Sequence, residues 1–159
     1  MSSQQFIGRY FHSIDEKGRV AIPHVFRTLL GGENENRVVI TQAATDTYTY
    51  LDLYPAAQWD SRVKRVLDME LDGDDAADVR EAWLANVVHP AQTVEPDKQG
   101  RVLVPQEHRE FARLDKEVVW TGDGQRFRLW ARAEYERYNR DKTTPDERNR
   151  IKRLKGVWL

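Results

Sequence analysis

Two arginines occupy the same place in two nearly identical turns of this chain. Residues 15–23 read DEKGRVAIP and residues 97–105 read DKQGRVLVP, so five of nine positions are identical at an offset of 82 residues (97 − 15). Arg19 and Arg101 each follow the glycine of their turn. A guanidinium beside a rigid turn can bind a phosphate or the edge of a guanine with two parallel N–H donors. The pair is therefore a candidate contact for nucleic acid.

The other residues of each turn suit a tight type I turn. Aspartate at the first position accepts hydrogen bonds from backbone amides, and glycine at the fourth position tolerates a positive φ angle. A second basic residue lies in each turn, one position earlier in the second turn than in the first. The expected DNA-contacting residues are Lys17, Arg19, Lys98 and Arg101, and the expected turn-forming or arginine-orienting residues are Asp15, Gly18, Asp97 and Gly100.

A single turn of this kind has a simpler interpretation, in which the arginine only pairs with the aspartate of its own turn. The second copy favours a contact surface instead, because one polypeptide then presents the same contact twice. Arg27 and Arg109 extend the match at the same offset. A third possibility, a hydrolytic enzyme that uses Asp15 and Asp97, lacks an accompanying base or metal cluster in the sequence.

Other catalytic and metal-binding signals are weak. The histidines at positions 12, 24, 89 and 108 are far apart and form no paired motif. Residues 72–75 (DGDD) resemble the start of a calcium loop, but Ala77 and Trp83 stand where such a loop needs glycine and glutamate. The absence of cysteine removes disulfides and thiolate chemistry. The sequence favours a protein that is not an enzyme and needs no cofactor or metal.

Length and composition indicate one globular domain. The chain has 159 residues, 40% of them hydrophobic, with five tryptophans, and a domain has roughly 100–200 residues. Each half alone would have a marginal core, so the halves should pack on each other or on another chain. No apolar run approaches the ~18 residues of a membrane span, and residues 1–5 lack the features of a signal peptide. We expect a cytoplasmic protein without a membrane partner.

The formal net charge of −1 hides an uneven distribution. Residues 68–81 contain seven acids and one base, whereas residues 140–155 contain seven bases and three acids. A local basic patch, rather than the total charge, is the feature expected of a nucleic-acid-binding protein. Charge blocks are also common on solvated faces, so this asymmetry adds little on its own.

The elements around the two turns are expected to repeat in the two halves. Alternating apolar residues predict a strand over 6–14, and after the turn the chain returns as a strand that Pro23 ends, because proline lacks an N–H donor. Pro23 and Pro105 suit the first turn of a helix. The expected strands are 6–14, 19–22, 38–41 and 48–53 in the first half and 93–95, 101–104, 118–121 and 126–130 in the second, with short helices over 24–30 and 105–112.

Two helical regions complete the expected fold. Apolar residues at helical spacing predict an antiparallel helix pair over 59–71 and 79–87, which links the halves. In the C-terminal region, a capping box at Thr144 begins a helix whose Ile151 and Leu154 point inward. Trp158 is expected to pack against a neighbouring subunit. The tryptophans expected in the core are Trp59, Trp83, Trp120 and Trp130.

These segments resemble the MraZ family, bacterial transcriptional regulators with a double SpoVT-AbrB domain. The resemblance extends from about residue 8 to residue 135 and rests on the two turns, residues 53–55 (LYP), Trp59, residues 114–119 (LDKEVV), Leu129 and Trp130. It implies an α+β fold in which hairpins of two internal repeats interlock into a swapped-hairpin β barrel, flanked by helical hairpins. The implied divisions are a first repeat over 8–55, linking helices over 56–89, a second repeat over 93–132 and C-terminal helices over 133–159.

The resemblance also implies a function. It implies binding of double-stranded promoter DNA at short direct repeats near division and cell wall genes, through the D-x-x-x-R turns. It implies assembly with further copies of the chain into closed rings, of about eight to twelve subunits. A nucleoid-associated location follows, and repression of transcription is the expected outcome.

The family motif transfers to this chain with one departure. The motif arginines are Arg19 and Arg101, and Lys17 matches the basic residue of the first turn. Gln99 occupies that place in the second turn, next to Lys98, so the second turn departs from the pattern. An AbrB-fold interaction module or antitoxin-like protein, whose arginines serve subunit interfaces without reading a DNA sequence, stays the alternative.

Overall fold

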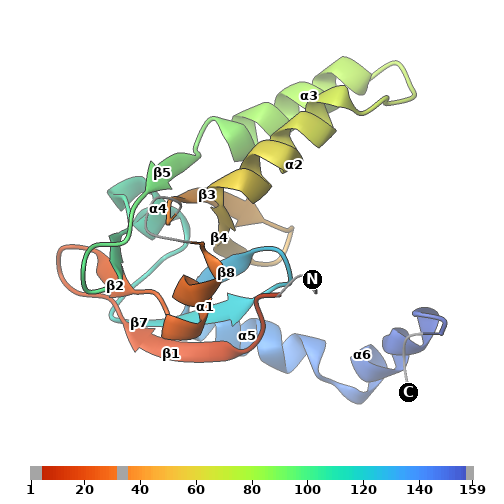
Figure 1. Cartoon of the computed structure of the whole chain (residues 1–159). Helices are drawn as coiled ribbons and strands as arrows, with labels where there is room; N and C mark the ends of the chain where they lie inside the picture. The colour runs from red at the N-terminus through yellow and green to blue at the C-terminus, as the bar shows by residue number, and fades with distance from the viewer. Residues whose placement is uncertain (1–4, 32–35, 157–159) are drawn as a thin grey trace.

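The computed structural model describes residues 5–31 and 36–156, and its fold is a mixed α+β fold (Figure 1). The strands are β1 (Arg9–Ser13), β2 (Arg19–Ala21), β3 (Val38–Ala44), β4 (Thr49–Pro55), β5 (Gln92–Val94), β6 (Arg101–Leu103), β7 (Glu117–Gly122) and β8 (Phe127–Ala131). The helices are α1 (His24–Leu29), α2 (Ala56–Asp68), α3 (Ala76–Trp83), α4 (Gln106–Phe111), α5 (Arg132–Lys142) and α6 (Pro145–Arg150). A π-helical turn, η1 (Leu84–Val88), follows α3, and a 3-10 turn, η2 (Ile151–Arg153), follows α6.

The strands of the two halves interlock. Six of them form one antiparallel sheet in the order β1-β7-β8-β4-β3-β5, and β2 and β6 form a separate two-stranded ribbon. β1 of the first half pairs with β7 of the second half, β4 pairs with β8, and β3 pairs with β5. The described sheet ends at the edge strands β1 and β5, so the closed barrel that the family resemblance implies is not found in it.

Two predicted hairpins are confirmed, and the pairing beside the motif turns differs from expectation. β3 pairs with β4, and β7 pairs with β8. The strands before and after the first motif turn do not pair with each other as a hairpin, because β1 pairs with β7 and β2 pairs with β6. Burial explains the exchange of partners: the pairing of β2 with β6 sets Val20 directly opposite Val102, and both side chains are 1% exposed.

One apolar core takes residues from the sheet, the ribbon and α1. Phe26 of α1, Trp120 of β7 and Phe127 of β8 are fully buried in it. The ring of Phe26 lies 5.1 Å from the ring of Phe127, so a short helix of the first half packs on a strand of the second. The indole N–H of Trp120 donates to the carbonyl of Ala21 at 3.0 Å, which satisfies the polar atom of this buried ring.

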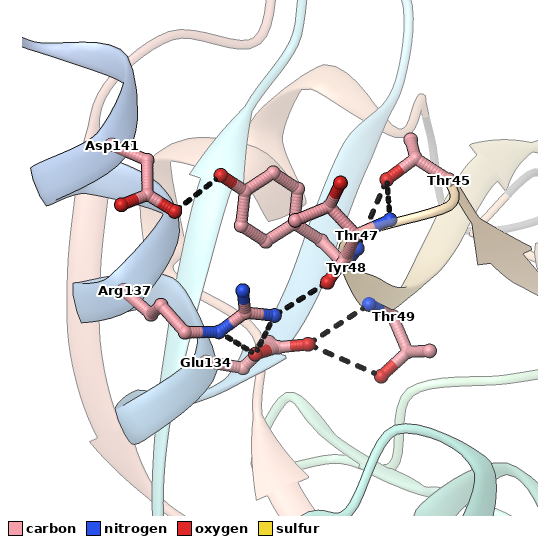
Figure 2. Close-up of polar contacts among 7 residues, drawn as sticks. All are labelled: Thr45, Thr47, Tyr48, Thr49, Glu134, Arg137 and Asp141. Carbon is pink, nitrogen blue, oxygen red and sulfur yellow. Dashed lines mark hydrogen bonds and ion pairs between the residues drawn. The ribbon is translucent and has the colours of Figure 1, made fainter.

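Polar contacts hold α5 against the turn between β3 and β4 (Figure 2). Glu134 accepts a hydrogen bond from the backbone N–H of Thr49 at 3.0 Å and pairs with Arg137 at 2.8 Å. The hydroxyl of Tyr48 donates to Asp141 at 2.6 Å, which raises the pKa of Tyr48. The end of the second half is thereby fixed to the first half. Tyr48 also belongs to a second apolar cluster, together with Tyr50, Val119, Trp130 and Tyr135.

The helix pair α2 and α3 extends away from the sheet (Figure 1). Neither helix contains a fully buried residue. Trp120 and Trp130 lie in the core as predicted, whereas Trp59 and Trp83 are only half-buried. The prediction that these two are core residues is wrong, because a projecting helix pair leaves one side of each helix in solvent.

The C-terminal region confirms one expectation and corrects another. Thr144 caps α6 as predicted and accepts a hydrogen bond from the N–H of Glu147 at 3.2 Å. The predicted inward orientation of Leu154 is wrong: α6 ends at Arg150, and the side chain of Leu154 is 58% exposed. Trp158 lies outside the described residues. None of the described helices is long and apolar enough to cross a membrane.

The position of Phe26 generates a stability prediction. Phe26→Ala should lower the free energy of unfolding by about 3–5 kcal/mol, because it leaves a cavity between the halves. The neighbouring residue of the same helix, Val25, is 47% exposed, so Val25→Ala should change stability by no more than about 0.5 kcal/mol. Denaturant unfolding of both variants checks this expectation. Similar losses for the two variants would contradict the assignment of α1 to the core.

Candidate nucleic-acid interface

The ribbon of β2 and β6 brings the two motif arginines onto one face. Val20 and Val102 point into the core, and side chains alternate along a strand. The outer face therefore consists of the residues on either side of them. Arg19 and Arg101 are diagonal neighbours in the antiparallel ladder, a position in which residues lie about 7–8 Å apart. Two guanidiniums from turns 82 residues apart in sequence (101 − 19) thus share a small surface. The outer residues are Arg19, Ala21, Arg101 and Leu103.

The aspartate of each turn fixes both the backbone and the arginine. Asp15 Oδ1 accepts from the backbone N–H groups of Lys17 at 2.9 Å and Arg19 at 2.8 Å, and Asp15 Oδ2 accepts from the Arg19 Nε at 2.7 Å. Asp97 repeats this arrangement with Gln99 and Arg101. There the three distances are 2.9, 2.9 and 3.1 Å. Both oxygens of each carboxylate thus accept hydrogen bonds within their own turn.

The protonation of these aspartates suits a fixed ion pair. Hydrogen bonds from the backbone N–H groups, foremost that of Arg19, lower the pKa of Asp15, and Arg101 has the same effect on the pKa of Asp97. Both carboxylates stay ionised at neutral pH and hold the Nε of their arginine. Among the described residues, the terminal guanidinium nitrogens of both arginines have no hydrogen-bond partner. They are available for a bidentate acceptor.

The glycine of each turn is covered by an arginine of the other half. Gly18 and Gly100 have φ angles of +90° and +76°, which confirms the positive φ expected of both. A Cβ atom at Gly18 would lie 2.7 Å from the guanidinium carbon of Arg109, and at Gly100 it would meet Arg27 even more closely. The sequence showed that Arg27 and Arg109 belong to the repeat but gave no sign of this exchange, because only the fold reveals which turn each arginine covers.

Backbone hydrogen bonds reinforce the exchange. The N–H of Ile22 donates to the carbonyl of Gly100 at 2.9 Å, and the N–H of Val104 donates to the carbonyl of Gly18 at 2.8 Å. Each bond joins a strand end of one half to the turn of the other half. The two motif turns are therefore held as one rigid unit.

The two lysines of the turns are exposed but not equivalent. Lys17 directly follows Glu16, whereas Lys98 occupies the position of Glu16 in its own turn, and Gln99 replaces the lysine there. The first turn thus has one acid and one base beside the D-x-x-x-R pair, and the second has one base and no acid. Both lysines belong to the turns that directly precede β2 and β6.

A second polar cluster lies between β4 and β8 and is compensated internally. Asp52 is 6% exposed and lies 3.3 Å from the Nε of Arg128 and 3.6 Å from that of Arg126. Burial raises the pKa of Asp52, and the two arginines oppose this effect. Arg128 also pairs with Asp123 at 2.6 Å. The cluster joins the two halves. Within residues 5–31 and 36–156, no three His, Asp or Glu side chains are grouped to hold a metal ion.

The packing of Arg109 on Gly18 can be tested by substitution. Gly18→Val should lower the free energy of unfolding by about 2 kcal/mol or more, because a β-branched residue is strained at this φ angle and would displace the guanidinium. Gly156→Val is the matched control. Gly156 has the same φ of +76° as Gly100, and nothing lies within 4 Å of the added atom.

The control variant should lose only the strain energy, about 1 kcal/mol. Thermal unfolding of both variants, with sizing of the assembly, separates the two contributions. Equal losses at positions 18 and 156 would show that the covering arginine has no effect on the turn.

Comparison with known proteins agrees with this repeat architecture. A family model described as MraZ protein, antitoxin-like, matches residues 5–81 and 87–154. A protein of Moorella thermoacetica named Transcriptional regulator MraZ is 37% identical over 136 residues, which are 86% of this chain and 87% of that protein.

Two further relatives have the same name. One, from Anaeromyxobacter dehalogenans, is 37% identical over 134 residues, covering 82% of this chain and 87% of its own length. Another, from Dictyoglomus thermophilum, is 30% identical over 154 residues, covering 96% of this chain and 98% of its own. The resemblance based on the two turns is confirmed, and the chain belongs to the MraZ family.

Proposed function

We propose that this protein is a transcriptional regulator that binds promoter DNA in a sequence-specific way through the ribbon of β2 and β6. One observation carries the proposal: Arg19 and Arg101 lie side by side on the outer face of the ribbon, each held at Nε by its own aspartate. The relatives are named as transcriptional regulators, which agrees with this function.

The shape of the ribbon suits the major groove of DNA. The major groove of B-form DNA is about 12 Å wide and admits a two-stranded β ribbon. An arginine whose Nε is already engaged can still direct its two terminal nitrogens at the O6 and N7 of a guanine. In this role Lys17 and Lys98 bind the phosphates that flank the groove, and Asp15 and Asp97 keep the arginines oriented.

The distribution of charge permits this contact despite the net charge of −1. The acidic segment 68–81 lies at the far end of the helix pair α2 and α3, away from the ribbon (Figure 1). The seven acids of this segment are thus remote from the face proposed to meet DNA, whereas Asp15, Glu16 and Asp97 lie in the turns themselves. At physiological ionic strength, exposed charges more than about 8 Å apart are largely screened from each other.

Assembly into a closed ring of about eight to twelve subunits is part of the proposal. Leu67 and Val79 on the projecting helices and Met69 directly after α2 are between 43% and 48% exposed, which gives a neighbouring subunit apolar side chains to cover. A ring presents many copies of the ribbon to direct repeats in a promoter. Linked weak contacts then gain affinity by roughly 10² to 10⁴ over a single contact.

In this role the protein acts in the cytoplasm on nucleoid DNA, as a repressor of division and cell wall genes, and without catalytic activity. The second candidate, an antitoxin-like interaction module, is favoured by one observation: the family model is itself described as antitoxin-like. The salt dependence of DNA binding distinguishes the two candidate functions. For a DNA-binding regulator, each neutralised phosphate changes the logarithm of DNA affinity by about −0.9 per unit change in the logarithm of salt concentration.

The central test of the proposal is Arg19→Ala. An arginine–guanine pair contributes about 1–3 kcal/mol of discrimination, and a ring presents several pairs. Specific binding should be lost while the assembly and its melting temperature are kept. Arg101→Ala should weaken binding less, because its turn has Gln99 where the first turn has Lys17. A gel shift at fixed salt, with a promoter fragment from upstream of the gene and a scrambled fragment, measures both.

A matched control removes one positive charge elsewhere. Arg150 pairs with Glu147 at 3.7 Å and is 71% exposed, on α6 at the opposite side of the molecule from β2 (Figure 1). Arg150→Ala should bind both fragments almost as wild type does. If Arg150→Ala loses as much DNA binding as Arg19→Ala, the affinity depends on overall charge rather than on the ribbon.

The proposed ring gives a separate prediction. Light scattering at micromolar concentration should give a single species of about eight to twelve copies of the 18.6 kDa chain. Leu67→Glu places a charge on the exposed apolar surface and should reduce this mass. A monomer of 18.6 kDa in the wild-type protein would remove the ring from the proposal.

A further inference from the structure

The outer face of the ribbon is not symmetric, although the backbone around it is. The repeat relates Arg19 to Arg101 and Val20 to Val102. It also relates Ala21 to Leu103, and these two differ greatly in size. One end of the ribbon therefore has a small side chain beside its arginine, and the other end has a large apolar one.

Leu103 is placed beside the first motif arginine and away from the core. It is the direct ladder partner of Arg19, a relation in which Cβ atoms lie about 4.5–5.5 Å apart. Its side chain is 55% exposed, whereas its neighbours Val102 and Val104 are fully buried. Ala21 stands in the same relation to Arg101 at the other end of the ribbon.

An exposed leucine beside an arginine has one apolar target in the major groove. The C5 methyl group of thymine is the only apolar group that a base pair presents there, and apolar side chains read it by contact. The Cβ spacing of direct ladder partners, about 4.5–5.5 Å, lies between one and two base-pair steps of about 3.4 Å each. A leucine beside a guanine-reading arginine thus reaches the adjacent base pair.

We propose that Leu103 binds the 5-methyl group of a thymine next to the guanine that Arg19 reads, and that Ala21 leaves the corresponding position beside Arg101 unread. This inference rests on the proposed function of the ribbon. The difference between Leu103 and Ala21 makes the ribbon asymmetric along the DNA, because only one of its ends reads a thymine. A directional unit fits direct repeats, in which every site has the same orientation, whereas a symmetric ribbon would fit an inverted repeat.

The test removes one methyl group at a time from the DNA. The probe is the tightest duplex that the wild-type protein selects from a randomised pool, and each of its thymines is replaced singly by deoxyuracil. For wild-type protein, one replacement beside an essential guanine should weaken binding by about 3- to 5-fold, the effect of one buried methyl group. Leu103→Ala should bind the thymine duplex about that much more weakly and should not distinguish thymine from uracil.

Two further variants complete the design. Ala21→Leu should create a second methyl-sensitive position, beside the guanine that Arg101 reads. Val25→Ala removes apolar atoms from another exposed side chain and should keep the methyl sensitivity of the wild type. Sizing confirms that each variant keeps the assembly, as expected for substitutions at exposed or half-exposed positions.

The outcomes separate this inference from the function on which it rests. If the wild-type protein selects and binds a duplex that Arg19→Ala no longer recognises, but tolerates uracil at every position, only the role of Leu103 is overturned. The role of Leu103 is also overturned if Leu103→Ala still binds the thymine duplex more tightly than the uracil duplex. If the wild-type protein selects no duplex, both the proposed function and this inference fail.

Discussion

Two backbone hydrogen bonds between the halves of the chain decide the geometry of the ribbon. They run from the N–H of Ile22 to the carbonyl of Gly100 and from the N–H of Val104 to the carbonyl of Gly18. Both carbonyls belong to glycines in a left-handed conformation, and both glycines are covered by an arginine of the opposite half. A change in one turn is therefore transmitted to the other. The face with two guanidiniums exists only because β2 of the first half pairs with β6 of the second half.

The ion pair in each turn controls orientation more than stability. An exposed pair of opposite charges adds little to the free energy of unfolding, since water screens it. The Nε contact with Asp15 or Asp97 nevertheless restricts the guanidinium before any ligand arrives, so less side-chain freedom is lost on binding. The same carboxylate also holds the backbone N–H groups of the turn. One acidic side chain thus couples the shape of the turn to the direction of the arginine.

The sequence was most informative where local chemistry determines structure. The tight turns with their glycines, the β3–β4 and β7–β8 hairpins and the cap at Thr144 follow from residues close together in the chain, and each was predicted. The partners of β1 and β2 were not, because alternation of apolar residues reveals a strand but not its neighbour. Trp59 and Trp83 show the same limit: helical spacing identifies an apolar face, but only the fold shows how far a helix projects from the core.

The candidate site was predictable in its parts but not in its arrangement. Repetition pointed to Arg19 and Arg101, and turn chemistry pointed to their aspartates. Their position on one face depends on the pairing of β2 with β6, which no local pattern encodes. That pairing also explains why the exposure of Leu103 could not be predicted from the sequence, since a leucine in a strand is normally expected to be a core residue.

The pairing of β1 with β7 also affects how the chain is made. Ser13 is the last residue of β1, and its ladder partner in β7, Glu117, lies about 100 residues further along the chain. Synthesis of these residues takes about 5–20 s at cellular rates of translation. During that interval β1 has no strand beside it on either edge, and an unpaired edge can pair with another nascent chain. Neighbouring ribosomes on one messenger carry many such chains. Because β1 pairs only with a strand of the second half, the first half of a nascent chain must stay separated from other nascent chains until β7 has been synthesised.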